Sequence, residues 1–117
     1  HEIVVLGVED DIATSFIKKH PDFAKGIIPK GTYKSLQSDL PTLTVWNFMV
    51  TYKDMPDDFI YAFTKEIFKN KPLLVSVHKS AQEVEPKNIL YCPIPLHPGA
   101  IKYYEEVGIK IPKEMRP

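Results

Sequence analysis

The stretch of sequence that decides the fold is residues 42–52, Thr-Leu-Thr-Val-Trp-Asn-Phe-Met-Val-Thr-Tyr. β-branched and aromatic side chains, which favour β-strands, occupy most of its positions. Apolar and polar side chains alternate only imperfectly along it, and this pattern is typical of a strand that is covered on both faces. The sequence therefore predicts a central, buried strand over residues 42–52.

The chain before this strand predicts a further strand and a helix. Residues 3–6 form a short apolar run, Ile-Val-Val-Leu, that is typical of a buried strand. Asp10 and Asp11 are placed to cap a helix. We expect this helix to end at His20, because the residue before Pro21 avoids helical backbone angles.

Helices are expected after the central strand. Phe59, Phe63 and Ile67 recur every four residues, which predicts an amphipathic helix lying on a sheet. Asp54 is placed as the cap of that helix. A second, short helix is expected to begin at Pro72, with its apolar side chains turned inward.

The C-terminal part of the chain predicts one more helix. Pro98 is suited to open this helix, which should end at Val107. Gly108 is placed as the first residue beyond the helix, where a left-handed backbone is common. Residues 110–117 are expected to be loosely ordered.

The predicted order of elements is strand, helix, extended segment, loop, strand and then several helices. The extended segment covers residues 26–29, and the loop covers the polar residues 34–39. This order indicates an α/β fold. One strong strand and a few weaker elements do not complete a sheet, so we expect much of the strand pairing to be missing.

Composition excludes several classes of protein. Fifteen basic and fifteen acidic residues give a formal net charge of zero, whereas nucleic-acid binding usually needs a basic excess on one face. We therefore expect no nucleic-acid partner. No apolar run approaches the roughly 20 residues of a membrane-spanning helix. The single cysteine excludes an intrachain disulfide and a Cys-rich metal site.

Cys92, His78 and His97 are the residues to weigh for catalysis. Cys92 lies among apolar and proline residues, so we expect it to be a buried structural residue. His97 precedes Pro98 and is expected to cap or pack the start of that helix, and His78 is expected to be exposed. No His-Glu-x-x-His motif or Gly-rich phosphate loop occurs. The sequence therefore predicts a protein that is not an enzyme and has no metal site.

Tyr33, Trp46 and Asn47 are the candidate ligand-binding residues. Tyr33 belongs to the loop that leads into the central strand, and Trp46 and Asn47 lie in the middle of that strand. A tryptophan in a strand is more often a core residue than a ligand contact. The amide of a buried asparagine must find hydrogen-bond partners, and a ligand is one such partner.

Residues 95–104 read Pro-Leu-His-Pro-Gly-Ala-Ile-Lys-Tyr-Tyr. This segment closely resembles the near-terminal motif of the TAXI family, the substrate-binding subunits of one class of TRAP transporters. Residues 28–33, Ile-Pro-Lys-Gly-Thr-Tyr, are similar to its Ile-Pro-Ala-Gly-Thr-Tyr segment, and residues 40–57 look like its strand and following helix start. Residues 34–36 depart from the family's Pro-Gly-Gln.

The resemblance implies a partial type II periplasmic-binding-protein fold, in which two α/β lobes joined by crossing strands close on a ligand. Residues 1–33 would form the end of the second lobe and the crossover segment. Residues 34–117 would return to the first lobe and supply its C-terminal helices. The implied protein is periplasmic or otherwise extracytoplasmic. It captures a small organic anion such as glutamate or a related dicarboxylate, delivers it to TRAP membrane subunits, and needs no cofactor.

Two other classes of function stay open. One is a free-standing interaction module, or an excised fragment that has no ligand of its own and associates with itself. A chain that begins at His1 and lacks a signal peptide is expected of a mature, truncated or internal piece. The other is a small hydrolase that uses Cys92 or His97. The sequence upstream of residue 1 distinguishes the transporter subunit from the module.

Overall fold

The computed structural model describes residues 4–117, and the chain forms two compact units, His1–Asn47 and Phe48–Pro117. The boundary that we predicted between lobes, after residue 33, falls in a loop of the first unit. The assignment of residues 1–33 and 34–117 to two lobes stays a prediction.

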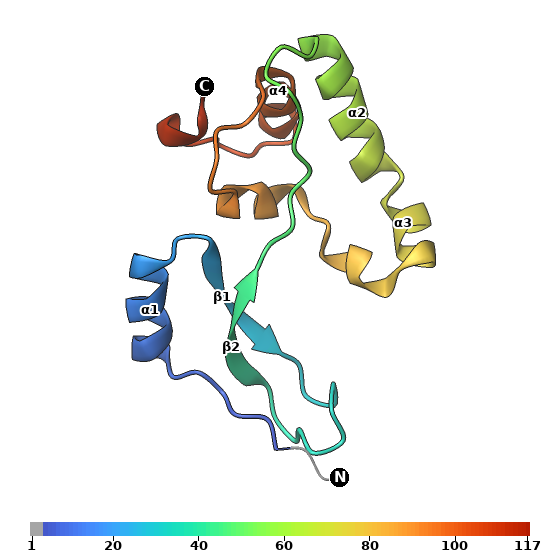
Figure 1. The fold of residues 1–117 in the computed structure, drawn as a ribbon. Helices are drawn as coiled ribbons and strands as arrows, with labels where there is room; N and C mark the ends of the chain where they lie inside the picture. The colour runs from blue at the N-terminus through green and yellow to red at the C-terminus, as the bar shows by residue number, and fades with distance from the viewer. Residues whose placement is uncertain (1–3) are drawn as a thin grey trace. The chain divides into compact units, whose positions relative to one another are not determined.

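The first unit is a helix beside a β-hairpin (Figure 1). Helix α1 is Asp10–Lys19, strand β1 is Phe23–Ile28, and strand β2 is Leu40–Val45. The two strands pair antiparallel, with Phe23 opposite Val45 and Ile28 opposite Leu40. The predicted helix end at His20, the extended segment and the polar loop are all confirmed.

Charged residues at its ends and an aromatic contact with β1 stabilise helix α1. Asp10 and Asp11 lie in its first turn and two lysines in its last, so the charges complement the helix dipole. The predicted capping by these aspartates is wrong, since Glu9 is the N-cap residue and makes no side-chain cap bond. Phe16 contacts Phe23 of β1 edge to face, with ring centroids 5.1 Å apart.

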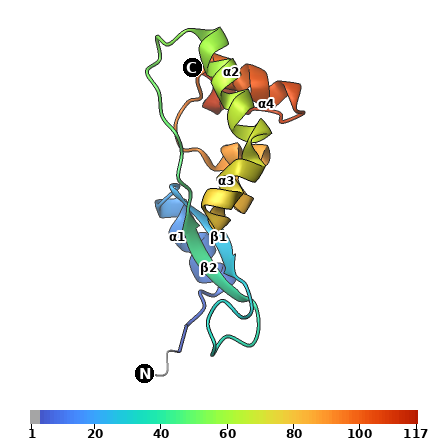
Figure 2. The same cartoon turned by 90° about the vertical axis from the view of Figure 1, so that its right-hand side faces the viewer.

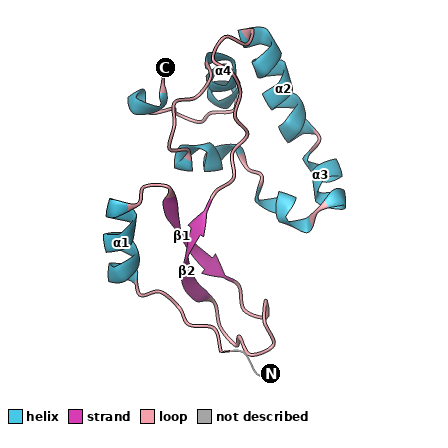
Figure 3. Cartoon of the chain, viewed as in Figure 1, coloured by secondary structure: helices cyan, strands magenta, loops and turns pink. Residues whose placement is uncertain are grey.

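Two of the predicted strands differ from the structure (Figure 3). Within the described residues, 4–9 form no strand, and Val4 is 77% exposed. Ile3 lies outside the described residues. The central strand predicted over residues 42–52 ends at Val45, and residues 46–52 are a loop. A strand persists only where a neighbouring strand takes up its backbone hydrogen bonds, and β1 pairs with β2 only over residues 40–45.

The second unit is helical. Six helical segments follow one another in it: α2 Asp57–Lys69, α3 Lys71–Val77, the 3-10 helices η1 Lys79–Glu83 and η2 Pro86–Tyr91, α4 Pro98–Glu106, and the 3-10 turn η3 Lys113–Met115. Helix α2 packs against α4 (Figure 2). The expectation that α2 also lies on a sheet stays a prediction.

The apolar faces of α2 and α3 are only partly buried. Ile60 is buried, but Phe59 and Phe63 stack on each other at the surface. Leu73 and Val77 of α3 are also exposed, which contradicts the inward orientation expected for that helix. Every-fourth spacing thus identified the helix, but packing against α4 selects a different face.

The cap of α2 is also not the predicted one. Pro56 is its N-cap residue, without a side-chain cap bond, so the role expected for Asp54 is wrong. Asp57 and Asp58 do lie in its first turn, where negative charge is favourable.

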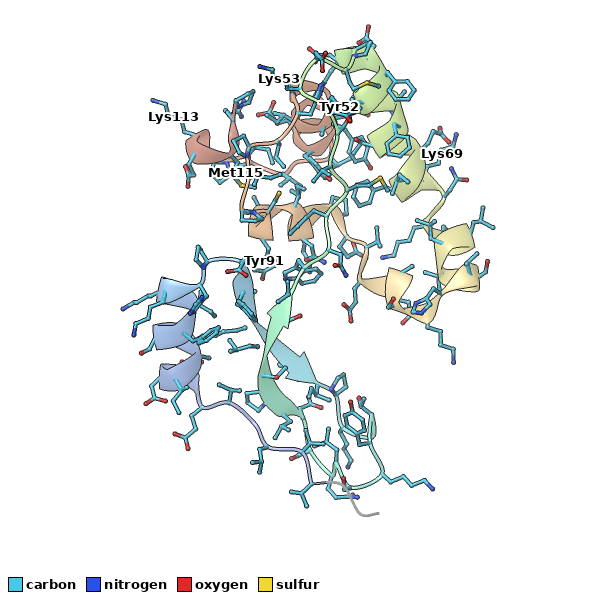
Figure 4. The ribbon with its side chains drawn as sticks, viewed as in Figure 1. Tyr52, Lys53, Lys69, Tyr91, Lys113 and Met115 are labelled. Carbon is cyan, nitrogen blue, oxygen red and sulfur yellow. The ribbon has the colours of Figure 1, made fainter. Side chains whose placement is uncertain are left out.

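The core of the second unit gathers around α4. Tyr103 stacks on Phe68 of α2, with ring centroids 5.4 Å apart. The buried cluster consists of Cys92, Leu96, Ile101, Tyr103, Tyr104, Ile111 and Met115. Ile111 and Met115 are 4% and 7% exposed, so the loosely ordered tail expected over residues 110–117 is wrong. Met115 lies on the last turn, η3 (Figure 4).

Helix α4 is the element that the sequence predicted best. It begins at Pro98 and ends at Glu106, one residue before the predicted end. Gly108 has a φ of +85°, and the amide of the next residue, Ile109, donates to the Tyr104 carbonyl at 2.8 Å. This is the C-terminal glycine geometry that the spacing predicted.

Burial of apolar surface is incomplete across residues 4–117. Within this range eighteen large hydrophobic side chains are exposed, against eleven buried hydrophobic residues. The sheet has two strands in the described part, so each strand has one edge without a neighbouring strand. No helix among these residues is long and apolar enough to cross a membrane.

Candidate functional site

The loop that carries Tyr33 joins the two strands of the hairpin. It runs from the end of β1 at Ile28 to the start of β2 at Leu40. Gly31 has a φ of +80°, a backbone angle that favours glycine. Tyr33 is 46% exposed, so this residue is accessible on the surface of the first unit.

Trp46 and Asn47 follow β2 directly. The strand ends at Val45, so these residues do not occupy the mid-strand position that the sequence predicted. Trp46 is half-buried and Asn47 is exposed. An exposed amide is solvated and needs no buried partner, so the argument for a ligand at Asn47 loses the burial on which it was based.

The hairpin keeps Tyr33 apart from Trp46. The loop that carries Tyr33 precedes β2, and Trp46 follows the other end of this strand. A six-residue strand rising about 3.3 Å per residue puts roughly 17 Å between these ends. Within this unit the structure therefore places Tyr33 and Trp46 at opposite ends of the hairpin. Their roles in ligand binding stay predictions.

The candidates for catalysis have structural positions. Cys92 is a buried, free cysteine in the core of the second unit, as expected. The His97 side chain is 5% exposed, and its Nδ1 accepts from the Gly99 amide at 3.1 Å. Its Nε2 lies 3.0 Å from the Met55 carbonyl oxygen and so carries the proton. The predicted capping role of His97 is confirmed. His78 is exposed, also as expected.

A polar cluster that the sequence did not reveal joins α2 to α4. Lys65 Nζ lies 2.9 Å from Tyr61 Oη and 2.8 Å from Glu106 Oε1. The Tyr61 hydroxyl also donates to Glu106, and the Lys102 ammonium lies 4.9 Å from the Tyr61 ring centroid. The spacing of Tyr61 and Lys65, four residues apart on one helix, is the signal that could have indicated half of this cluster.

Charge pairing fixes the protonation of this cluster. Bonds from Lys65, and then from Tyr61, lower the pKa of the Glu106 carboxyl below its usual range. The bonds that Lys65 makes to Glu106, and then to Tyr61, raise the pKa of Lys65. Lys65 is therefore a protonated ammonium at neutral pH, which cannot act as a nucleophile or base. The cluster therefore joins α2 to α4 through hydrogen bonds and an ion pair.

Metal-ligating side chains do not gather in the part of the chain that the structure describes. Residues 4–117 contain no group of three or more histidine, cysteine, aspartate or glutamate side chains placed to hold a metal ion. Lys65 pairs with Glu106, and the ammonium groups of Lys65 and Lys102 lie 5.2 and 4.9 Å from the Tyr61 ring centroid.

Helices combined with a small two-stranded sheet are compatible with an α/β fragment. The model of the NMT1-like family matches residues 1–108, which is nearly the whole chain. The chain belongs to the NMT1-like family. That family is related to periplasmic binding proteins, so membership indicates a solute-binding protein in general terms.

Proposed function

We propose that the chain is the C-terminal part of a TAXI-type substrate-binding subunit of a TRAP transporter. The observation that carries this proposal is the family match over residues 1–108. The TAXI-like motif at residues 95–104 adds the finer assignment. In the fold this motif is the capped start of α4, which supports a structural role for the motif in closing the helical unit.

The proposed protein has the two-lobed type II binding fold, with this chain as one part of it. Its incompletely covered surface supports that arrangement. Val4 and Val45 are 77% and 54% exposed. The described hairpin has two strands, and its outer edges have no neighbouring strand, although the Val8 amide donates to the Pro41 carbonyl at the edge of β2. Further chain would cover such surfaces, because large exposed apolar patches are uncommon on soluble proteins.

The proposed ligand is a small organic anion such as glutamate or a related dicarboxylate, captured outside the cytoplasm and delivered to the TRAP membrane subunits. Tyr33 is the best-placed contact in this chain, since the residue is accessible and carries an aromatic ring and a hydroxyl. Arg116 is the only arginine, and it pairs with Glu105. Charge neutralisation of the anion is therefore assigned to residues outside this chain.

We also propose that the protein is not an enzyme. The buried thiol of Cys92 lies within a hydrophobic cluster. Both ring nitrogens of His97 are bonded to backbone groups, and Lys65 is held as an ammonium. Cys92, His97 and Lys65 thus each have a structural role.

An uptake assay tests the transport role. Membrane vesicles that contain the TRAP membrane subunits should take up labelled glutamate or succinate when the complete protein is added outside. Here the complete protein means the product of the whole reading frame that contains residues 1–117. The same vesicles without the protein should take up little label. Equal uptake with and without the protein would contradict the proposal.

An interaction module without a ligand is the second candidate. The stacked, exposed pair of Phe59 and Phe63 on α2 favours it, since such a patch is suited to contact another protein surface. This reading expects the 117-residue chain to associate with itself. Sedimentation of the chain tests this: a dimer lost in Phe63→Ser, together with no solute binding by the complete protein, would support the module.

A further inference from the structure

We propose that Leu36 and Asp39 are positioning residues that hold Tyr33 in a preformed loop for ligand binding. This role rests on the proposed solute-binding function. Three observations support it. Tyr33 is accessible, hydrogen bonds join the beginning of the loop to its later residues, and the Leu36 side chain is buried.

Two hydrogen bonds close the loop across its base. The Lys30 amide donates to Asp39 Oδ1 at 2.8 Å. The Gly31 amide donates to the Leu36 carbonyl at 3.1 Å. Residues that begin the loop are therefore bonded to residues that end it, and the loop has a fixed entry and exit.

The backbone on both sides of Tyr33 is also bonded. The Thr32 amide donates to the Pro29 carbonyl at 3.1 Å, and the Leu36 amide donates to the Tyr33 carbonyl at 2.9 Å. The Thr32 hydroxyl donates to the same Pro29 carbonyl at 2.7 Å. Tyr33 itself remains 46% exposed, so the residue is accessible while these bonds are formed.

Leu36 is the buried side chain of the loop. It is 8% exposed, whereas the other residues from 31 to 39 are exposed. In the described part of this unit the other buried hydrophobic residues are Ala13 and Ala24, so Leu36 is the largest buried side chain there. Loss of this buried side chain should free the loop even where the hairpin remains.

A loop that is already ordered before the ligand arrives favours binding. A loop that is disordered before binding loses conformational entropy when it meets a ligand, and a preformed loop does not. The carboxylate of Asp39 is exposed and its described role is to accept from Lys30. Its contribution to binding is therefore indirect, through the position of Tyr33.

Matched variants of Asp39 separate geometry from charge. Asp39→Ala removes the acceptor, whereas Asp39→Asn keeps an oxygen that can accept from the Lys30 amide. Asp22→Ala makes the same charge change in the turn before β1, at the far end of the hairpin. Leu36→Ala removes most of the buried side chain, and Leu36→Met keeps most of its volume.

Two readouts are needed. One is hydrogen exchange of the Lys30 amide in the 117-residue chain, which needs no ligand. The other is calorimetric affinity of the complete protein for glutamate, or for succinate if glutamate does not bind. Asp39→Ala should speed exchange and weaken affinity by roughly fivefold, as the loss of one hydrogen bond would. Asp39→Asn, Asp22→Ala and Leu36→Met should stay near wild type, and Leu36→Ala should resemble Asp39→Ala.

The outcomes distinguish the two proposals. Faster exchange in Asp39→Ala with unchanged affinity would overturn the positioning role alone, because loop order would not matter for binding. Unchanged exchange would overturn it as well. Failure of the wild-type complete protein to bind either solute would instead contradict the solute-binding function, and with it any ligand role of Tyr33. Failure of Asp39→Asn to restore affinity would assign the effect to charge rather than to position.

Discussion

The side chain of His97 joins the start of α4 to the segment before α2. It accepts from the Gly99 amide and donates to the Met55 carbonyl, and it is almost fully buried. His97→Ala should lower the free energy of unfolding by about 1 kcal/mol, as lost helix caps do. Urea unfolding of the 117-residue chain measures this effect.

The same variant checks that His97 lies outside the ligand site. In the complete protein, His97→Ala should leave the preference between glutamate and succinate unchanged. A large change in preference with normal stability would place His97 in the site.

Tyr104 gives the structure a pH dependence at high pH. Burial raises the pKa of its phenol to about 12 from the ordinary value of 10.0. A raised pKa contributes stability below pH 10, and this contribution is lost as the pH rises towards the folded value. Between pH 10 and pH 12, the free energy of unfolding should therefore fall less for Tyr104→Phe than for the wild type, and the difference should be about 2 kcal/mol.

Urea unfolding at several pH values measures how steeply the free energy of unfolding falls with pH in each variant. Tyr52 (Figure 4) serves as the control residue. Because Tyr52 is 80% exposed, unfolding of Tyr52→Phe should depend on pH as unfolding of the wild type does. Parallel slopes for wild type and Tyr104→Phe would contradict a buried, neutral phenol.

Tyr33 and Asn47 test the ligand site residue by residue. In the complete protein, Tyr33→Ala should weaken solute binding by roughly 1–3 kcal/mol through a lost hydrogen bond, and Asn47→Ala should have the same effect. Tyr52→Ala removes an exposed tyrosine outside the candidate site and serves as the control. Titration calorimetry measures the affinities, and unchanged values for both variants would remove both residues from the site.

At the scale of elements, the contact between α2 and α4 depends on a glycine. A Cβ atom at Gly99 would lie 2.2 Å from the Asp57 carbonyl oxygen, which is backbone and cannot turn aside. Gly99→Ala should therefore destabilise the second unit by about 1–3 kcal/mol, as overpacking does. Glycine to alanine in an open helix position stabilises instead. Urea unfolding gives the sign, and a stabilised variant would contradict the close approach of the helices.

Helix ends were predictable where the signals are local. Pro98 and Gly108 fix the ends of α4 by their own backbone preferences, and the structure follows them. Capping by Asp10 or Asp54 depends on a side chain reaching a particular amide. In the structure Glu9 is the N-cap residue of α1 and Pro56 is the N-cap residue of α2.

Strands and buried faces were less predictable, because they depend on partners far away in the sequence. Residues 46–52 have strong β propensity, yet no strand of the described chain lies alongside them. The spacing of Phe59 and Phe63 predicts a helix but not which face meets α4. Likewise, Ile111 and Met115 are buried by a cluster that brings residues 92–115 together, which local sequence does not indicate.

At the scale of the whole molecule, the candidate site was predicted only in part. The sequence indicated that Tyr33 lies in a loop, and the structure agrees. The sequence did not indicate the roles of Leu36 and Asp39 in that loop. Asp39 accepts a hydrogen bond from the Lys30 amide and Leu36 is buried, and both features arise only when the hairpin folds. The family match accounts for nearly the whole chain and supplies the general class of solute-binding protein.

The measurement that tests the account most directly is titration calorimetry of glutamate and succinate into the complete protein and into the 117-residue chain. We expect saturable binding of one of these anions to the complete protein. The 117-residue chain should bind it barely or not at all, because half of a two-lobed site would be missing. Tight binding by the 117-residue chain alone would contradict the two-lobed site, and no binding by the complete protein would contradict a role in capturing these organic anions.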